Sequence, residues 1–172
     1  MLSQVVQEAI NEQVNNEFYS SYLYLAMSAF CERQQFLGCA KWLRVQSQEE
    51  YGHAMRLYDF LTARAGTVHL TSIAEPPAEF PSVSDVFTES LRHEQEVTTR
   101  IDRLYEMAFA EKAFSTLVEL QWFITEQVEE EKTVREIVHK FELVKADPAS
   151  LLELDRELGQ RSAGPVAPVP NG

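Results

Sequence analysis

The feature that most constrains this fold is a very long segment without a helix breaker. From Ser82 to Val144 the sequence contains neither glycine nor proline, and apolar residues recur throughout at helical spacing. A single helix over this segment would span roughly 90 Å at about 1.5 Å per residue. Because a chain of 172 residues is the size of one domain, we predict two helices here, with a turn near Glu111-Lys112-Ala113.

Two further long helices are predicted before this segment. The first covers residues 3 to about 31, and the second covers about 36 to 65. Gly66 is expected to end the second helix, because glycine accepts left-handed backbone angles. In the first helix the apolar residues at helical spacing are Val6, Ile10, Val14, Leu25 and Phe30.

The remaining helix breakers and capping residues complete an all-α architecture. Residues 66–82 contain glycine and proline stops and no periodicity, so they are expected to cross the length of the bundle. Ser82 and Asp85 match a capping box, which begins the third helix. Asp147-Pro148 begins a short fifth helix that stops at Gly159. The predicted fold is a four-helix bundle with one long crossover loop and a short fifth C-terminal helix.

Composition and charge narrow the classes of function. We predict one domain over residues 1–160 and a disordered proline-rich tail over 161–172. The net charge of −12 argues against a nucleic-acid partner and favours cations. Neither a signal peptide nor an 18-residue apolar run is present, so a cytoplasmic protein without membrane contact is expected. Cys31 and Cys39 are expected to be reduced, packed thiols.

Each of the four long helices has an inward row with an acid near its midpoint. If the helices pack side by side, these acids meet at one height, between apolar residues above and below them. The rows are Ile10, Val14, Glu17, Ser21 and Tyr24; Leu43, Glu50, His53 and Leu57; Val83, Phe87, Ser90, Glu94, Val97 and Ile101; and Leu120, Phe123, Gln127, Glu130, Val134 and Ile137.

Such a cluster of buried acids indicates a metal site. Each buried unpaired charge costs several kcal/mol, and the rows contain no basic partner for structural ion pairs. Glu50 and His53 lie one turn apart, with Cβ atoms about 5–6 Å from each other. Taken alone, this pair is more often a solvated pair on a helix surface, and the other three acids reverse that interpretation. Carboxylate oxygen with one imidazole suits Fe(II) or Mn(II).

Two motifs resemble a known family. EEYGH at 49–53 and QWFITEQVEEEKT at 121–133 resemble the matching stretches of bacterial non-haem ferritins, members of the ferritin-like di-iron carboxylate family, and Tyr24 and Glu94 fall where that family has them. The resemblance covers roughly residues 1 to 160.

The resemblance implies iron storage with ferroxidase activity. Fe(II) would be oxidised by O2 or H2O2 and stored as an Fe(III) mineral inside a 24-subunit shell. It also implies a ferroxidase centre for two irons, with Tyr24 and Gln127 beside it, and a third iron site. The implied ligands of the centre are Glu17, Glu50, His53, Glu94 and Glu130, and those of the third site are Glu49, Glu126 and Glu129.

Departures from related families refine this expectation. Gln127-x-x-Glu130 stands where a bacterioferritin repeats Glu-x-x-His, so two metal sites of unequal affinity are expected. Tyr51 occupies the place of the haem-binding Met of bacterioferritins, so no haem is expected. Trp122 is interpreted as a core residue. The histidines without a partner at ligand spacing are interpreted as loop or surface residues; they are His69, His93 and His139.

Three alternatives remain open at this point. A soluble di-iron peroxidase or oxygenase on the same bundle would need a substrate channel or an electron-transfer module. A miniature ferritin of twelve subunits normally places its iron ligands between subunits, which disagrees with four acids in one chain. A structural helical adaptor would leave the inward acids unexplained.

Overall fold

The computed structural model describes residues 2–162 and contains five α-helices and no strand within that range. The predicted all-α fold with a short fifth helix is confirmed, and so is the turn at Glu111-Lys112-Ala113. The predicted tail from residue 163 onward lies outside the described residues. The helices are α1 (Gln4–Arg33), α2 (Leu37–Ala63), α3 (Val83–Ala110), α4 (Phe114–Val144) and α5 (Pro148–Leu158).

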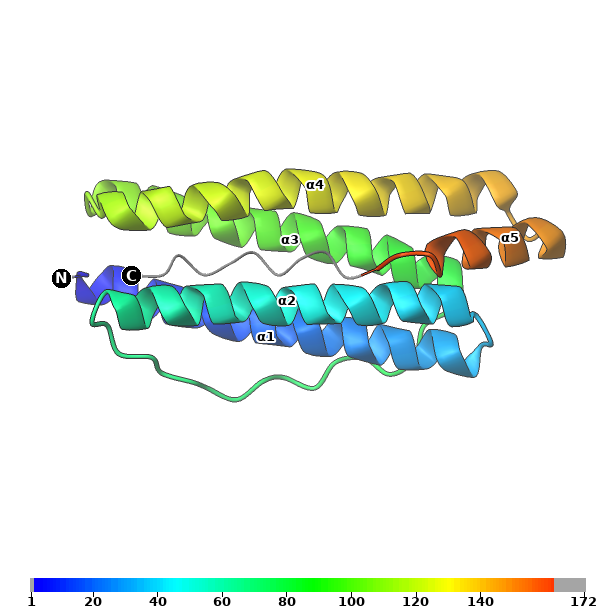
Figure 1. Cartoon of the computed structure of the whole chain (residues 1–172), viewed down its shortest axis with the longest axis horizontal. Helices are drawn as coiled ribbons and strands as arrows, with labels where there is room; N and C mark the ends of the chain where they lie inside the picture. The colour runs from blue at the N-terminus through cyan, green and yellow to red at the C-terminus, as the bar shows by residue number, and fades with distance from the viewer. Residues whose placement is uncertain (1, 163–172) are drawn as a thin grey trace.

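The four long helices form a bundle of two antiparallel pairs (Figure 1). Short turns join α1 to α2 and α3 to α4, while the segment between α2 and α3 runs the length of the bundle, so α2 and α3 are parallel. The backbones of α1 and α2, of α3 and α4, and of α1 and α3 pack closely, whereas α2 and α4 approach each other less closely. Long side chains therefore fill the space between α2 and α4.

The caps agree with the sequence at two of the helix starts. Ser82 Oγ accepts a hydrogen bond from the Asp85 backbone N–H at the start of α3. Asp147 Oδ2 accepts one from Ser150 N–H at 2.8 Å at the start of α5. Each side chain satisfies an N–H group that the first turn leaves without a helical partner.

The end of α2 differs from the prediction. The residue with left-handed backbone angles is Ala65, with φ of 55°, rather than Gly66. The N–H of Gly66 instead donates to Leu61 O at 2.8 Å and closes the helix end. A Cβ at Gly66 would lie 3.1 Å from Gln7 Oε1, so this glycine allows close approach of α1. The left-handed role predicted for Gly66 was wrong because the hydrogen bond that closes the helix places the left-handed turn one residue earlier.

The inward rows predicted from the sequence are buried, apart from Ser21, which is half-buried. Leu25, which shares the apolar spacing of the first helix, is exposed instead. The apolar core forms two clusters, one toward each end of the bundle. The acids occupy the layer between these two clusters, since Glu17 separates Val14 from Tyr24 on α1 and Glu130 separates Phe123 from Val134 on α4. None of the helices within residues 2–162 is both long and apolar enough to cross a membrane.

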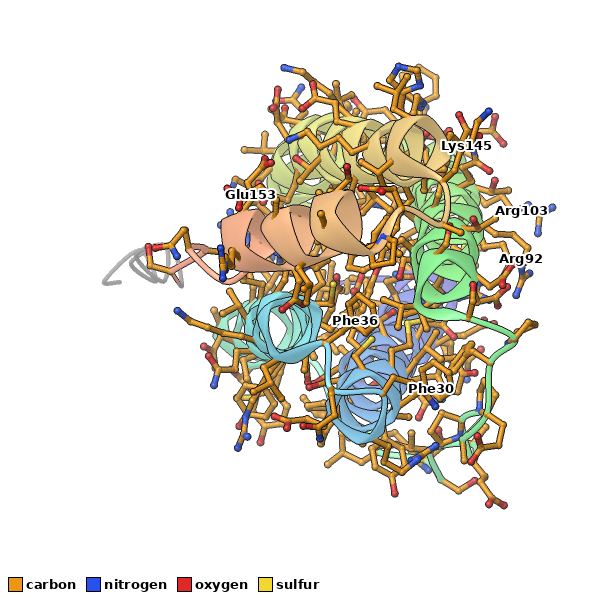
Figure 2. The ribbon with its side chains drawn as sticks, turned by 90° about the vertical axis from the view of Figure 1, so that its right-hand side faces the viewer. Phe30, Phe36, Arg92, Arg103, Lys145 and Glu153 are labelled. Atoms are coloured by element: carbon orange, nitrogen blue, oxygen red, sulfur yellow. The ribbon has the colours of Figure 1, made fainter. Side chains whose placement is uncertain are left out.

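The short helix α5 packs on the beginning of α2, between α2 and α4 (Figures 1 and 2). Phe36 at the N-cap of α2 has no side-chain oxygen that could accept a hydrogen bond from the first turn. Asp155 of α5 supplies the missing acceptor. The Asp155 carboxylate accepts hydrogen bonds from Gly38 N at 3.1 Å and from Cys39 N at 2.8 Å. An anion at a helix N-terminus is stabilised by the helix dipole. Both cysteines of the chain, Cys31 and Cys39, are free and buried, as expected.

Gly38→Ala is expected to destabilise the protein, because a Cβ there would lie 1.7 Å from Asp155 O. The backbone of α5 must move to accommodate it, at a cost of about 2–3 kcal/mol. The thermal midpoint should fall by about 5–10 °C, measured by circular dichroism. Gly52→Ala is the matched control on the same helix, since a Cβ at Gly52 meets nothing within 4 Å, and this change should be neutral or stabilising. An unchanged midpoint in Gly38→Ala would contradict this close packing.

Candidate metal centre

The four long helices bring four carboxyl groups and one imidazole into the layer between the two core clusters. Each side chain is at least nine-tenths buried: Glu17 on α1, Glu50 and His53 on α2, Glu94 on α3 and Glu130 on α4. Arg92 and Arg103 of α3 do not balance these acids, because both project outward from the bundle (Figure 2), and Arg92 pairs with partly exposed acids of its own helix. The buried layer therefore carries an excess of acidic groups.

Two glutamines hold the acids in place. Gln13 Nε2 donates to Glu17 Oε1 at 2.7 Å. Gln46 Nε2 donates to Glu50 Oε1 at 2.9 Å and to Glu130 Oε2 at 2.8 Å, and so connects α2 to α4. Among the described residues, the buried Glu17 Oε2 has no hydrogen-bond partner. A buried oxygen without a partner is costly, and a cation would satisfy it.

Tyr24 and Gln127 converge on the carboxylate of Glu94. The Tyr24 hydroxyl donates to Glu94 Oε1. Gln127 Nε2 lies 3.2 Å from Glu94 Oε2 and 3.4 Å from the hydroxyl of Thr98. The structure thus places the two residues predicted to stand beside the centre in direct contact with one of its acids.

The ligand atoms form two groups that could hold a metal ion. Within each group, atoms of three residues lie within 4.8 Å of one another. Glu17, Glu50 and His53 form the first group, which is fully buried, and His53, Glu126 and Glu130 form the second. His53 belongs to both. Carboxylate oxygens with an imidazole are a donor set for divalent iron or manganese.

Burial and mutual repulsion keep protons on most of these acids when no metal is present. Burial, followed by the neighbouring charge of Glu50, raises the pKa of Glu17 to about 8 and that of Glu130 to about 7. The same two causes, with Glu130 in addition, raise the pKa of Glu94 well above its ordinary value. Glu50 thus acts on the carboxyl groups of all three other helices.

Glu50 and His53 form the charged pair of the cluster. His53 Nδ1 lies 3.2 Å from Glu50 Oε2. Although burial opposes it, the Glu50 carboxylate raises the pKa of His53 to about 10. Burial likewise opposes ionisation of Glu50, yet the imidazole lowers the pKa of this acid below its ordinary value. A cation that binds here must displace the proton of His53.

Two aromatic neighbours confine the imidazole. The His53 ring makes edge contacts with Trp122 and Phe123, at centroid distances of 5.3 and 6.0 Å. Arg56 lies over the Trp122 ring at 4.2 Å and pairs with Glu119. These contacts bridge α2 and α4 and fix the orientation of the His53 ring.

His93 is buried, whereas a loop or surface position was predicted for it from the sequence. Only 3% of it is exposed, and its Nε2 lies 2.8 Å from the Ser20 hydroxyl. Its ring also makes an edge contact with Tyr24. The prediction was wrong because it considered ligand spacing along α3 alone, whereas the partner of His93 is on α1.

A family model described as a ferritin-like domain matches residues 7–144, which include every acid of this layer. The chain belongs to the ferritin family.

Relatives of known name agree with this assignment. The chain is 41% identical over 161 residues to a bacterial non-heme ferritin of Bacteroides fragilis, with 94% of this chain and 100% of the relative covered. It is 39% identical over 158 residues to a bacterial non-heme ferritin of Escherichia coli, with 92% and 96% covered. A solved structure described as an open pore ferritin from the archaeon Archaeoglobus fulgidus superposes with a TM-score of 0.93 at 44% identity, covering 94% of this chain and 100% of that chain.

In this ferritin, the three residues implied for a third iron site have different surroundings. Glu126 joins the group with His53 and Glu130. Glu129 is exposed, and Glu49 is paired with Arg161. Their role as ligands remains a prediction. Tyr51, at the place of the haem-binding Met of bacterioferritins, is exposed and contacts Phe18.

Sequence reasoning missed the supporting glutamines, although a signal for them exists. Gln13 stands four residues before Glu17, and Gln46 stands four residues before Glu50. At this spacing the two side chains of each pair share one helix face. The repeated Gln-x-x-x-Glu spacing on α1 and α2 therefore could have indicated these hydrogen bonds.

Proposed function

We propose that this ferritin binds Fe(II) between its four long helices, oxidises it with O2 or H2O2, and stores the Fe(III) as mineral in a 24-subunit shell. The observation that carries this proposal is the buried group of Glu17, Glu50 and His53, in which one carboxylate oxygen lacks a partner among the described residues. Family membership and the chemistry of the ligand set support iron as the cation.

The position of Glu50 supports a two-iron centre. Glu50 belongs to the group with Glu17 and His53, and Gln46 connects it to Glu130 of α4, so we propose that it lies between two ions. One ion would take Glu17 and His53, and the other would take Glu94 and Glu130. Each Fe(II) loses one electron, so a pair supplies the two electrons that reduce O2 to H2O2 or H2O2 to water.

Residues of the chain account for the protons that metal binding releases and for the charge that stabilises the bound iron. Metal binding displaces protons from Glu17, Glu94 and Glu130 and leaves His53 as a neutral imidazole. The Tyr24 hydroxyl and the Gln127 amide keep Glu94 oriented. Because carboxylates are hard donors, the site stabilises the Fe(III) product. We propose that Glu49, Glu126 and Glu129 then hold a third iron on its way out of the centre.

The test is aerobic addition of Fe(II) to the metal-free protein, followed by near-ultraviolet absorbance of the Fe(III)–oxo product. A fast phase is expected to saturate near two irons per subunit, because the proposed centre is of the di-iron carboxylate type, and slow uptake should continue beyond it. Sedimentation would show whether the protein assembles as a large shell, and electron microscopy would show whether that shell holds an electron-dense core. Fast oxidation without further uptake would favour a di-iron peroxidase or oxygenase. A rate equal to that of protein-free buffer would contradict the proposal.

A further inference from the structure

The end of α5 places an arginine beside the proposed iron sites. Gly38 and Gly159 allow the backbones of α2 and α5 to touch, since a Cβ at Gly159 would lie 3.1 Å from the Cα of Gly38. Lys41 Nζ also donates to Gly159 O at 2.7 Å. This contact fixes the direction in which the chain leaves α5, so the position of Arg161 is determined by backbone packing.

Arg161 lies along one face of α2 over two helical turns. Its guanidinium carbon is 4.1 Å from the centre of the Trp42 ring, which is buried. Its Nη2 donates to Glu49 Oε2, seven residues and two turns further along α2. The side chain is only 20% exposed, and stacking on an aromatic ring with a carboxylate at its end is a favourable setting for a guanidinium. The Arg161 side chain is therefore held in one position by its contacts and does not move freely at the surface.

The partner of Arg161 is one of the three residues proposed as ligands of the third iron. Glu49 precedes Glu50 of the two-iron centre, and its carboxylate points to Arg161 instead of joining the group that contains Glu126. A guanidinium and a cation compete for the same carboxylate oxygens, and the fixed positive charge also repels an incoming ion. While the ion pair persists, the third site lacks one of its ligands.

We propose that Arg161 is a built-in competitor of iron at the third site: it holds Glu49 against the end of α5 and releases this carboxylate when a cation binds at Glu126. This inference rests on the proposed function. Its consequence is a third site that binds iron weakly and so passes it onward, because each ion must displace the arginine. The C-terminal end of α5 thereby controls how long iron stays between the two-iron centre and the mineral.

The experiment is anaerobic calorimetric titration of the metal-free protein with Fe(II). Arg161→Gln removes the charge and should tighten binding of the third ion about tenfold, which corresponds to roughly 1.4 kcal/mol, and should change the affinity for the first two ions much less. Arg161→Lys keeps the charge without the planar fork and should fall between the two. Arg156→Gln is the matched control, since this arginine of α5 is exposed and pairs with Glu153, and it should change nothing.

A second variant separates competition from indirect effects. In Glu49→Gln the third ion should bind more weakly than in the unaltered protein. Adding Arg161→Gln to it should give a much smaller gain than Arg161→Gln gives alone, because the contested carboxylate is gone and only the repulsion by the arginine is relieved. Circular dichroism confirms that each variant is folded. Unchanged or weakened third-ion binding in folded Arg161→Gln, with the first two ions intact, would overturn the inference and leave the proposed function standing. Failure of the unaltered protein to bind the first two ions would instead overturn the proposed function, and the inference with it.

Discussion

Glu50→Ala is expected to abolish the fast phase of Fe(II) oxidation, with a loss of more than about 100-fold in rate. Changes to residues that merely support a metal ligand typically cost about 10–100-fold, and Glu50 is proposed as a ligand of both ions. It pairs with His53, and its charge acts on Glu17, Glu94 and Glu130. Stopped-flow absorbance after mixing with aerobic Fe(II) measures the rate.

The matched control for this variant is Gln48→Ala, which changes an exposed residue two positions away on the same helix. Its fast phase should equal that of the unaltered protein in rate and in the number of irons consumed. If Glu50→Ala kept the fast phase at a comparable rate, the two-iron centre could not lie where we propose. Because Glu50→Ala leaves the buried His53 without its carboxylate partner, the variant is expected to be less stable, so circular dichroism must show that it is folded before its rate is compared.

The metal-free protein is expected to lose stability as the pH rises from 5 to 8. Burial and neighbouring acids raise the pKa of Glu17 to about 8 and of Glu130 to about 7, against 4.5 ordinarily. Between these values the native state holds protons that the unfolded chain releases, so the free energy of unfolding falls with rising pH. The stability is fully present below 4.5 and is lost as pH rises through about 7 and 8.

Glu50 and His53 do not reverse this fall in stability with rising pH. The raised pKa of His53, about 10 against 6.5 ordinarily, contributes stability below 6.5 that is lost as pH rises toward 10. Glu50 has a lowered pKa, so its contribution is already complete above 4.5. The net loss between pH 5 and 8 is on the order of 5 kcal/mol, or about 10–20 °C in the thermal midpoint.

Thermal unfolding of the metal-free protein at pH 5 and pH 8 measures this effect, with assembly checked at both values. Glu17→Gln is the control, because it removes one carboxyl group with a raised pKa and should reduce the pH dependence of the thermal midpoint. Anaerobic Fe(II) at pH 8 should restore the midpoint, since an ion that binds the native state alone stabilises it. A midpoint that rises with pH in the metal-free protein would contradict the buried, protonated state of these acids.

Local signals in the sequence were sufficient for the helices and for most of the buried layer. The helical period, the cap at Ser82 and the acid at the middle of each row are local properties, and the structure agrees with each of them. Contacts between elements distant along the chain leave no such pattern. Asp155 caps α2 from far along the sequence, and Arg161 reaches Glu49 from the segment predicted to be tail. Periodicity shows which face is buried but not which partner it meets.

The wide spacing of α2 and α4 has a consequence for how such a bundle can change over time. The close backbone contacts that hold the bundle together are those of α1 with α2, α3 with α4, and α1 with α3. Side chains bridge α2 and α4, including Gln46 to Glu130 and His53 to Trp122. Residues on this interface can therefore be exchanged while the backbone framework stays in place. The same scaffold can evolve a different metal preference or a different reaction without first having to evolve a new fold.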